Sequence, residues 1–150
     1  MHPFKTSAGG RNFAAAEAGS WKGLREHGFV HPKLGPVTGK LFLQQVLGLT
    51  SMEVSLGVVP AGGGLPFYHR HKEHEELYIF VGGRGQFQVD DRTLDVREGS
   101  VIRVSPEGER TWRNNSTEDL YYIVVQARAG SVSSDTTTDG VGVQRPVVWK

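Results

Sequence analysis

The chain contains no cysteine among its 150 residues. This absence excludes disulfide bonds, thiolate catalysis and metal sites that use cysteine ligands. No apolar run approaches the length needed to span a bilayer, and residues 1–10 lack the hydrophobic core of a signal peptide. We therefore expect one cytoplasmic domain with no membrane partner.

Excess charge of one sign is also missing. The sequence holds 17 lysines and arginines against 16 aspartates and glutamates, and no long run of one sign occurs. A nucleic-acid-binding protein usually carries a basic stripe, so we expect no nucleic-acid partner. A small-molecule ligand is the expected partner instead.

Helix signals are scarce, whereas 20 glycines and 7 prolines punctuate the chain. The best helix candidate, residues 13–22, is short enough for only one or two turns. Residues 52–58 alternate between apolar and polar side chains, as a half-buried strand does. Runs of apolar, β-branched or aromatic residues predict further strands at 41–49, 77–81 (buried on both faces), 120–127 and 146–149. Short strands at spacings of roughly 8–12 residues indicate an all-β barrel or sandwich.

Three of the six histidines lie close together at positions 69, 71 and 74. Residues two apart on a strand share a face, so His69 and His71 could present two imidazoles to one metal ion. A carboxylate would complete a set that binds divalent transition metals and leaves coordination positions open. Glu75 shares this face in an unbroken strand, whereas Glu76 does so if residues 72–75 form a loop. The alternative is a solvated surface loop.

This region resembles the first motif of the cupin superfamily: glycine, five residues, His-x-His, three or four residues, glutamate, six residues, glycine. Gly63, His69, His71, Glu76 and Gly83 match it. The pair of Glu75 and Gly82 also fits, but Gly83-Arg84-Gly85 resembles the turn that often ends the motif. The resemblance therefore favours Glu76.

A second cupin motif, Gly-x5-Pro-x-Gly-x2-His-x3-Asn, is partly present. Gly99, Pro106-Glu107-Gly108 and Asn115 correspond to it, with one extra residue before the proline. Read from Pro106, the histidine position holds Thr111. The resemblance implies a single double-stranded β-helix, or jelly-roll barrel, over residues 50–128. An N-terminal arm (1–40) and a C-terminal arm (129–150) would flank it within one domain.

The resemblance also implies a metal site formed by His69, His71 and Glu76, with His74 as a possible substitute ligand. The expected cofactor is a divalent transition metal such as zinc, nickel, manganese or iron. If Thr111 takes the place of a ligand, Arg113 shares its face and could contact substrate. Tyr78 shares the face of Glu76 and is a third candidate for substrate binding.

Two functions stay open on this basis. The first is a metal-dependent enzyme, similar to dioxygenases or isomerases, that acts on a small polar molecule; no catalytic residue is assigned. The second is a non-catalytic binding or sensing protein that has lost its metal, and a storage role ranks last. The apolar segment 41–49 and the N-terminal arm predict a homodimer.

Overall fold

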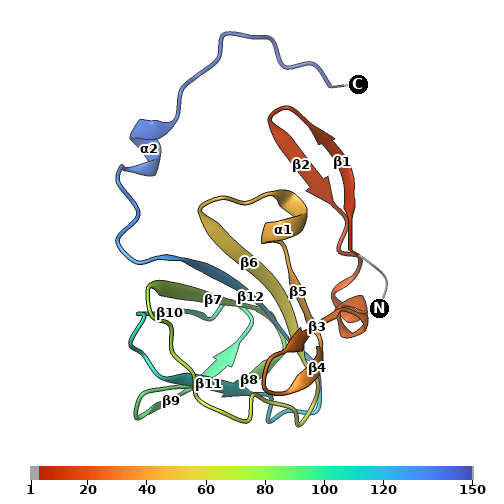
Figure 1. Cartoon of the computed structure of the whole chain (residues 1–150), viewed down its shortest axis with the longest axis vertical. Helices are drawn as coiled ribbons and strands as arrows, with labels where there is room; N and C mark the ends of the chain where they lie inside the picture. Colours follow the sequence, from red (N-terminus) through yellow and green to blue (C-terminus); the bar gives the residue numbers. More distant parts are fainter. Residues whose placement is uncertain (1–3, 150) are drawn as a thin grey trace.

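The computed structural model describes residues 4–149, and the two largest of its antiparallel sheets face each other to form a barrel (Figure 1). The larger sheet has the strand order β10-β7-β12-β6-β5, and the smaller has the order β11-β8-β9. The strands of the two sheets are β5 (Lys40–Phe42), β6 (Met52–Val59), β7 (His74–Gly82), β8 (Arg84–Val89), β9 (Arg92–Arg97), β10 (Val101–Val104), β11 (Arg110–Arg113) and β12 (Leu120–Arg128). The expected all-β jelly-roll fold is confirmed.

The core lies between the inner faces of these sheets. Aromatic side chains fill most of it, since the rings of Phe87 and Trp112 stack at 6.1 Å and those of Tyr78 and Phe80 pack against Phe87. The β7 strand alternates between fully and partly buried residues. Residues 77–81 are therefore buried completely on one face only, and the expectation of burial on both faces is wrong.

Strand β5 is the edge of the larger sheet and sends neighbouring side chains in opposite directions. Leu41 packs outward with Leu24 and Val58 in a second, smaller cluster. Lys40 turns inward, where its amine lies 6.0 Å from the centre of the Trp112 ring. The alternation follows from the period of two residues in a strand.

The strand expected over residues 41–49 ends after three residues. Glu53 explains the change, because its Oε1 accepts hydrogen bonds from the backbone N–H groups of Leu43 (3.1 Å) and Gln44 (2.9 Å). These bonds satisfy donors at the start of a single helical turn, α1 (Gln44–Leu47). The turn ends at Gly48, whose φ of 67° lies in the left-handed region.

Three residues paired across strands β5, β6 and β12 form a row on the inner face of the larger sheet. In register, Lys40 pairs with Gly57, and Gly57 pairs with Tyr122. A Cβ atom at position 57 would lie only 2.2 Å from the ring of Tyr122. Glycine at this position therefore lets the Tyr122 ring lie flat against the sheet beside Lys40.

The two arms differ from the sequence expectation. Residues 13–16 form strand β2 (Phe13–Ala16), paired with β1 (Thr6–Gly10), so the helix expected at 13–22 is wrong there. A 3-10 helix, η1 (Trp21–Glu26), follows, and then the hairpin of β3 (Gly28–His31) and β4 (Gly35–Thr38). The β1–β2 hairpin and the C-terminal segment both extend away from the barrel (Figure 1).

The C-terminal segment carries one helical turn, α2 (Thr136–Asp139), and no strand at 146–149, contrary to the prediction. Its side chains find no partner sheet, so no ladder forms there. Within residues 4–149, none of the helices has both the length and the apolar character needed to cross a membrane.

Candidate functional site

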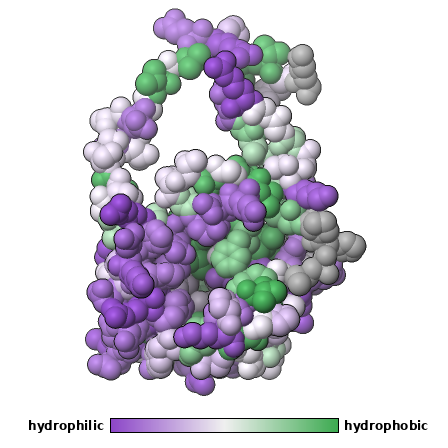
Figure 2. All heavy atoms as spheres, in the orientation of Figure 1, coloured by the Kyte–Doolittle hydropathy of each residue, from purple (hydrophilic) through white to green (hydrophobic). Residues whose placement is uncertain are grey.

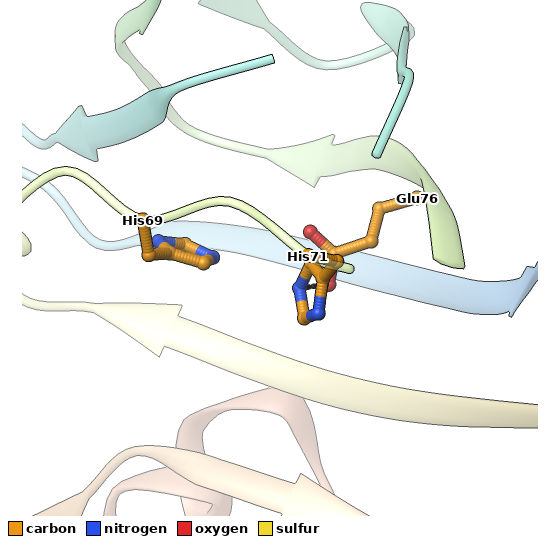
Figure 3. A group of neighbouring side chains, drawn as sticks. All are labelled: His69, His71 and Glu76. Atoms are coloured by element: carbon orange, nitrogen blue, oxygen red, sulfur yellow. Dashed lines mark ion pairs between the residues drawn. The ribbon is translucent and has the colours of Figure 1, made fainter. Parts of the chain in front are cut away.

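Two histidines and one glutamate converge inside the barrel (Figure 3). His69 and His71 lie on the loop between β6 and β7, and Glu76 comes from the start of β7 and reaches toward His71. Each of the three offers a ligand atom within 4.8 Å of the other two. These three side chains therefore turn inward, whereas Arg70 and Lys72 of the same polar run stay exposed to solvent.

Backbone hydrogen bonds hold the histidine loop against the barrel wall. His69 and Arg110 exchange two of them, with N–H to O distances of 3.1 and 3.0 Å. The N–H of His71 donates to the carbonyl of Pro106 at 3.0 Å. The two bonds between His69 and Arg110 form an isolated antiparallel β-bridge. The two imidazoles are fixed on one side of the loop by this pairing.

Glu76 is buried and surrounded by hydrogen-bond donors. Its Oε2 accepts from the hydroxyl of Tyr78 at 2.5 Å and from the Nη2 of Arg110 at 2.5 Å. Its Oε1 lies 3.1 Å from Nε2 of His71. Only Oε2 is occupied by well-aligned hydrogen bonds, so Oε1 remains available to an additional cation.

These contacts determine the charge state of the site. Burial opposes ionisation of Glu76, but the close contact with His71 and the hydrogen bonds from Tyr78 and Arg110 outweigh it and lower its pKa to about 2. Burial, with the nearby Arg110 cation second, lowers the pKa of His69 to about 4. Near neutral pH the site therefore holds an ionised glutamate and a neutral His69 imidazole, which is the form that binds metals.

Two buried imidazole nitrogens lack a hydrogen-bond partner among the described residues: Nδ1 of His69 and Nε2 of His71. Nε2 of His71 is close to Glu76, yet the angle between them does not suit a hydrogen bond. An unsatisfied buried nitrogen is costly, so each calls for a ligand. Two imidazole nitrogens and a carboxylate oxygen form a donor set that suits a divalent transition metal.

A cavity of about 420 Å³ opens beside His69. Most of the side chains around it are apolar, and the charged or titratable ones are Lys40, His31, His69 and Tyr122. The full lining comprises Phe29, His31, Leu34, Val37, Thr38, Gly39, Lys40, Val58, Val59, Pro60, Gly63, Gly64, Leu65, Phe67, His69, Trp112 and Tyr122. Figure 2 shows hydrophobic residues gathered near the middle of the face of the molecule in view, above the β3–β4 hairpin.

The structure assigns the positions of the second cupin motif to different residues than the sequence analysis did. Arg110 and Trp112 face the barrel interior, whereas Thr111 and Arg113 alternate with them and face away. Arg110, and not Thr111, stands opposite Glu76 where the motif's histidine is expected. The side chain of Asn114, and not Asn115, is buried and donates to the carbonyls of Val59 and Glu118.

Thr111 and Arg113 belong to a second cavity of about 290 Å³ on the other side of β11. The hydroxyl of Thr111 donates to the carbonyl of Leu65 at 2.8 Å, and Arg113 donates to the side chain of Gln86. Neither lines the larger cavity. Their contact with a ligand stays a prediction, and the geometry confines it to the smaller cavity.

The remaining candidates are placed as follows. Tyr78 is fully buried and donates a hydrogen bond to Glu76, but it does not line the larger cavity, so its contact with substrate stays a prediction. Glu75 points to the opposite face of β7 and pairs with Arg103 at 2.6 Å. Nδ1 of His74 lies 3.0 Å from the amide nitrogen of Gln126. His74 and Glu75 are therefore outside the convergent set.

Two functional candidates were missed by sequence reasoning, namely Arg110 and Lys40. For Arg110 a signal existed: the motif places its histidine eleven residues after the first glycine, and Arg110 is eleven residues after Gly99. The one-residue displacement of Pro106 within the motif hid this spacing. Lys40 gives no such signal, because only the pairing of β5 with β6 brings it into the barrel.

Comparison with known proteins agrees with this geometry. A family model described as "Cupin domain" matches residues 55–126. A cupin protein of known structure from Bacteroides fragilis is 36% identical, with 69% of this chain and 88% of that chain covered and a TM-score of 0.67. No match was found among curated proteins.

More distant structures share the fold. A Cupin 2 conserved barrel domain protein from Salinispora arenicola is 20% identical, covering 70% of this chain and 84% of that one, with a TM-score of 0.57. A putative sugar phosphate isomerase from Acidithiobacillus ferrooxidans is 22% identical, covering 67% and 66%, with a TM-score of 0.58. With the family model, the Bacteroides relative and the convergent His-His-Glu geometry, these findings show that the chain belongs to the cupin superfamily.

Proposed function

We propose that this cupin is a metal-dependent enzyme that binds a small molecule in the larger cavity. The observation that carries the proposal is the pair of unpartnered buried nitrogens on His69 and His71, gathered with Glu76 within 4.8 Å. Zinc, nickel, manganese and iron all accept such a donor set, and geometry and supply decide among them.

The chain's own residues prepare the site in three ways. Tyr78 and Arg110 hold one oxygen of Glu76, which directs the other toward His71. The neutral state of His69 leaves its free nitrogen ready as a ligand. A bound divalent cation would supply Lewis acidity and open coordination positions to an oxygen-bearing substrate.

The lining of the cavity narrows the range of substrates that we expect. The sequence predicts a small polar molecule, but Phe29, Leu65 and Phe67 offer no hydrogen bonds from their side chains. A sugar would leave hydroxyl groups unpaired against such walls, at a cost in affinity. A substrate with a mainly apolar body fits better, so we favour oxygenase-type chemistry over isomerisation of a sugar.

A second candidate function is binding or sensing without metal. Arg110 favours it, because this fixed cation sits beside Glu76 and cancels its charge. A metal held by two neutral imidazoles and this paired carboxylate would have its own charge largely uncompensated by the protein. The site would then bind metal weakly, and the cavity alone would carry the function.

Elemental mass spectrometry of untagged protein purified without chelators tests the first candidate. We expect about one equivalent of a transition metal in the wild type and in a His27→Ala control, and none in the His69→Ala/His71→Ala variant. Failure of the wild type both to retain metal and to take up added zinc, nickel, manganese or iron would refute the metal-dependent enzyme. That result would leave the metal-free binding protein as the function.

A further inference from the structure

Lys40 places an amine at the wall of the larger cavity. Its side chain lies on the inner face of β5, in register with Gly57 and beside Tyr122. Among residues 4–149, its amine has no hydrogen bond to a protein atom and no carboxylate within ion-pair distance. The amine lies 5.2 Å from the centre of the Phe42 ring and 6.0 Å from that of Trp112. Aromatic faces attract a cation but accept no conventional hydrogen bond.

The carboxylates that act on the Lys40 cation, those of Glu76 and Glu53, lie beyond ion-pair distance from its amine. No acidic side chain lines the cavity in the described part of the chain. The nearest buried carboxylate, Glu76, already forms an ion pair with Arg110 through Oε2. Burial lowers the pKa of Lys40, since its charged form loses contact with water. The amine of this half-buried side chain faces the cavity without an ion-pair partner, so a ligand that carries an anionic group would supply one.

We propose that Lys40 binds the carboxylate of an otherwise apolar ligand, which places this class of molecule in the larger cavity. This inference rests on the proposed function only in sharing its cavity. The apolar body of the ligand would lie among Phe29, Leu65 and Phe67, which line the same space. The carboxylate end would lie toward His69, since Lys40 and His69 line one continuous cavity.

Isothermal titration calorimetry with 4-phenylbutyrate and its neutral amide, 4-phenylbutyramide, tests the assignment. The two probes share an apolar body and differ in charge. With protein freed of metal by a chelator at pH 7, we expect the carboxylate to bind at least about tenfold more tightly than the amide. Lys40→Met should abolish this difference, whereas Lys5→Met, which removes an exposed charge that does not line the cavity, should preserve it.

Several outcomes would overturn the proposal. Equal binding of the two probes by the wild type, or no binding of either, would mean that the cavity does not select carboxylates. A preference that persists in Lys40→Met would assign it to another group. A preference seen only after zinc is added would assign it to the metal and would support the metal site while refuting Lys40. Comparison of the probes on the wild type keeps the test decisive even if Lys40→Met fails to fold.

Discussion

The Nη2 atom of Arg110 lies 2.5 Å from Oε2 of Glu76, inside a barrel where cupins commonly hold a metal ion. The arginine is fully buried, and its Nη1 also donates to the carbonyl of Gly108 at 2.8 Å. A fixed organic cation therefore occupies one side of the predicted metal site. This ion pair, together with the contacts from His71 and Tyr78, keeps Glu76 ionised without metal.

Replacing Arg110 by histidine should strengthen metal binding. The variant removes a positive charge and offers an imidazole beside His69, His71 and Glu76, which frees Oε2 of the glutamate. We expect zinc affinity to rise by roughly 10–100-fold, the range associated with groups that support a metal site. Competition with a chromophoric chelator measures the change.

The matched control is Arg113→His, which lies on the same strand but faces away from the site. Its zinc affinity should equal that of the wild type. Without metal, Arg110→His should unfold more easily, by about 3–5 kcal/mol, because Glu76 is left without its buried partner. An Arg110→His variant with unchanged zinc affinity would contradict the placement of this residue.

The free energy of unfolding of metal-free protein should depend on pH in two steps. The folded state holds His69 neutral down to a pKa of about 4, whereas the unfolded chain takes up the proton near pH 6.5. Stability is therefore complete above about pH 6.5 and falls as the pH drops toward 4. Glu76 adds a second fall between about pH 4.5 and 2, since its pKa is lowered to about 2.

Urea unfolding at a series of pH values checks both steps. A His69→Gln variant should lose the fall between pH 6.5 and 4 while keeping the fall at lower pH. Identical pH profiles for this variant and the wild type would show that another group causes the first step.

Removing the hydroxyl of Tyr78 should destabilise the barrel. The hydroxyl donates to the buried carboxylate of Glu76, and a hydrogen bond to a charged group contributes about 1.5–3 kcal/mol. Tyr78→Phe should lower the free energy of unfolding by this amount and raise the pKa of Glu76. Tyr121→Phe is the control, because its hydroxyl contacts Asp119 near the surface and its loss should cost less. Equal losses in the two variants, measured by urea unfolding, would contradict the role of the buried contact.

The homodimer expected from the sequence stays a prediction. In the isolated chain the C-terminal segment exposes six large apolar side chains, including that of Trp149 at 91%. Burying them against a second copy would be favourable. Light scattering should therefore report a dimer, and a chain truncated after Ala129 should be a monomer with an intact barrel. A monomeric full-length chain at working concentration would refute the expectation.

The sequence alone determined the fold class and the approximate position of the site. Alternating side chains in residues 52–58, glycine punctuation and the spacing of His69, His71 and Glu76 are local patterns, and each reports directly on strand period or motif geometry. The choice of Glu76 over Glu75 rested on the resemblance of Gly83-Arg84-Gly85 to the turn that often ends the motif, and the structure places Glu76 with the histidines.

Tertiary structure alone decided which charges face the site. Arg110 and Thr111 are neighbours in sequence, and a shift of one residue in a strand reverses the face of each side chain. Only the register of β11 against β8, and the bridge to His69, fixes Arg110 inward. Lys40 likewise enters the cavity because β5 pairs with β6, which places it opposite Gly57, seventeen positions further along the chain. The register of such long-range pairing is not encoded in local sequence patterns.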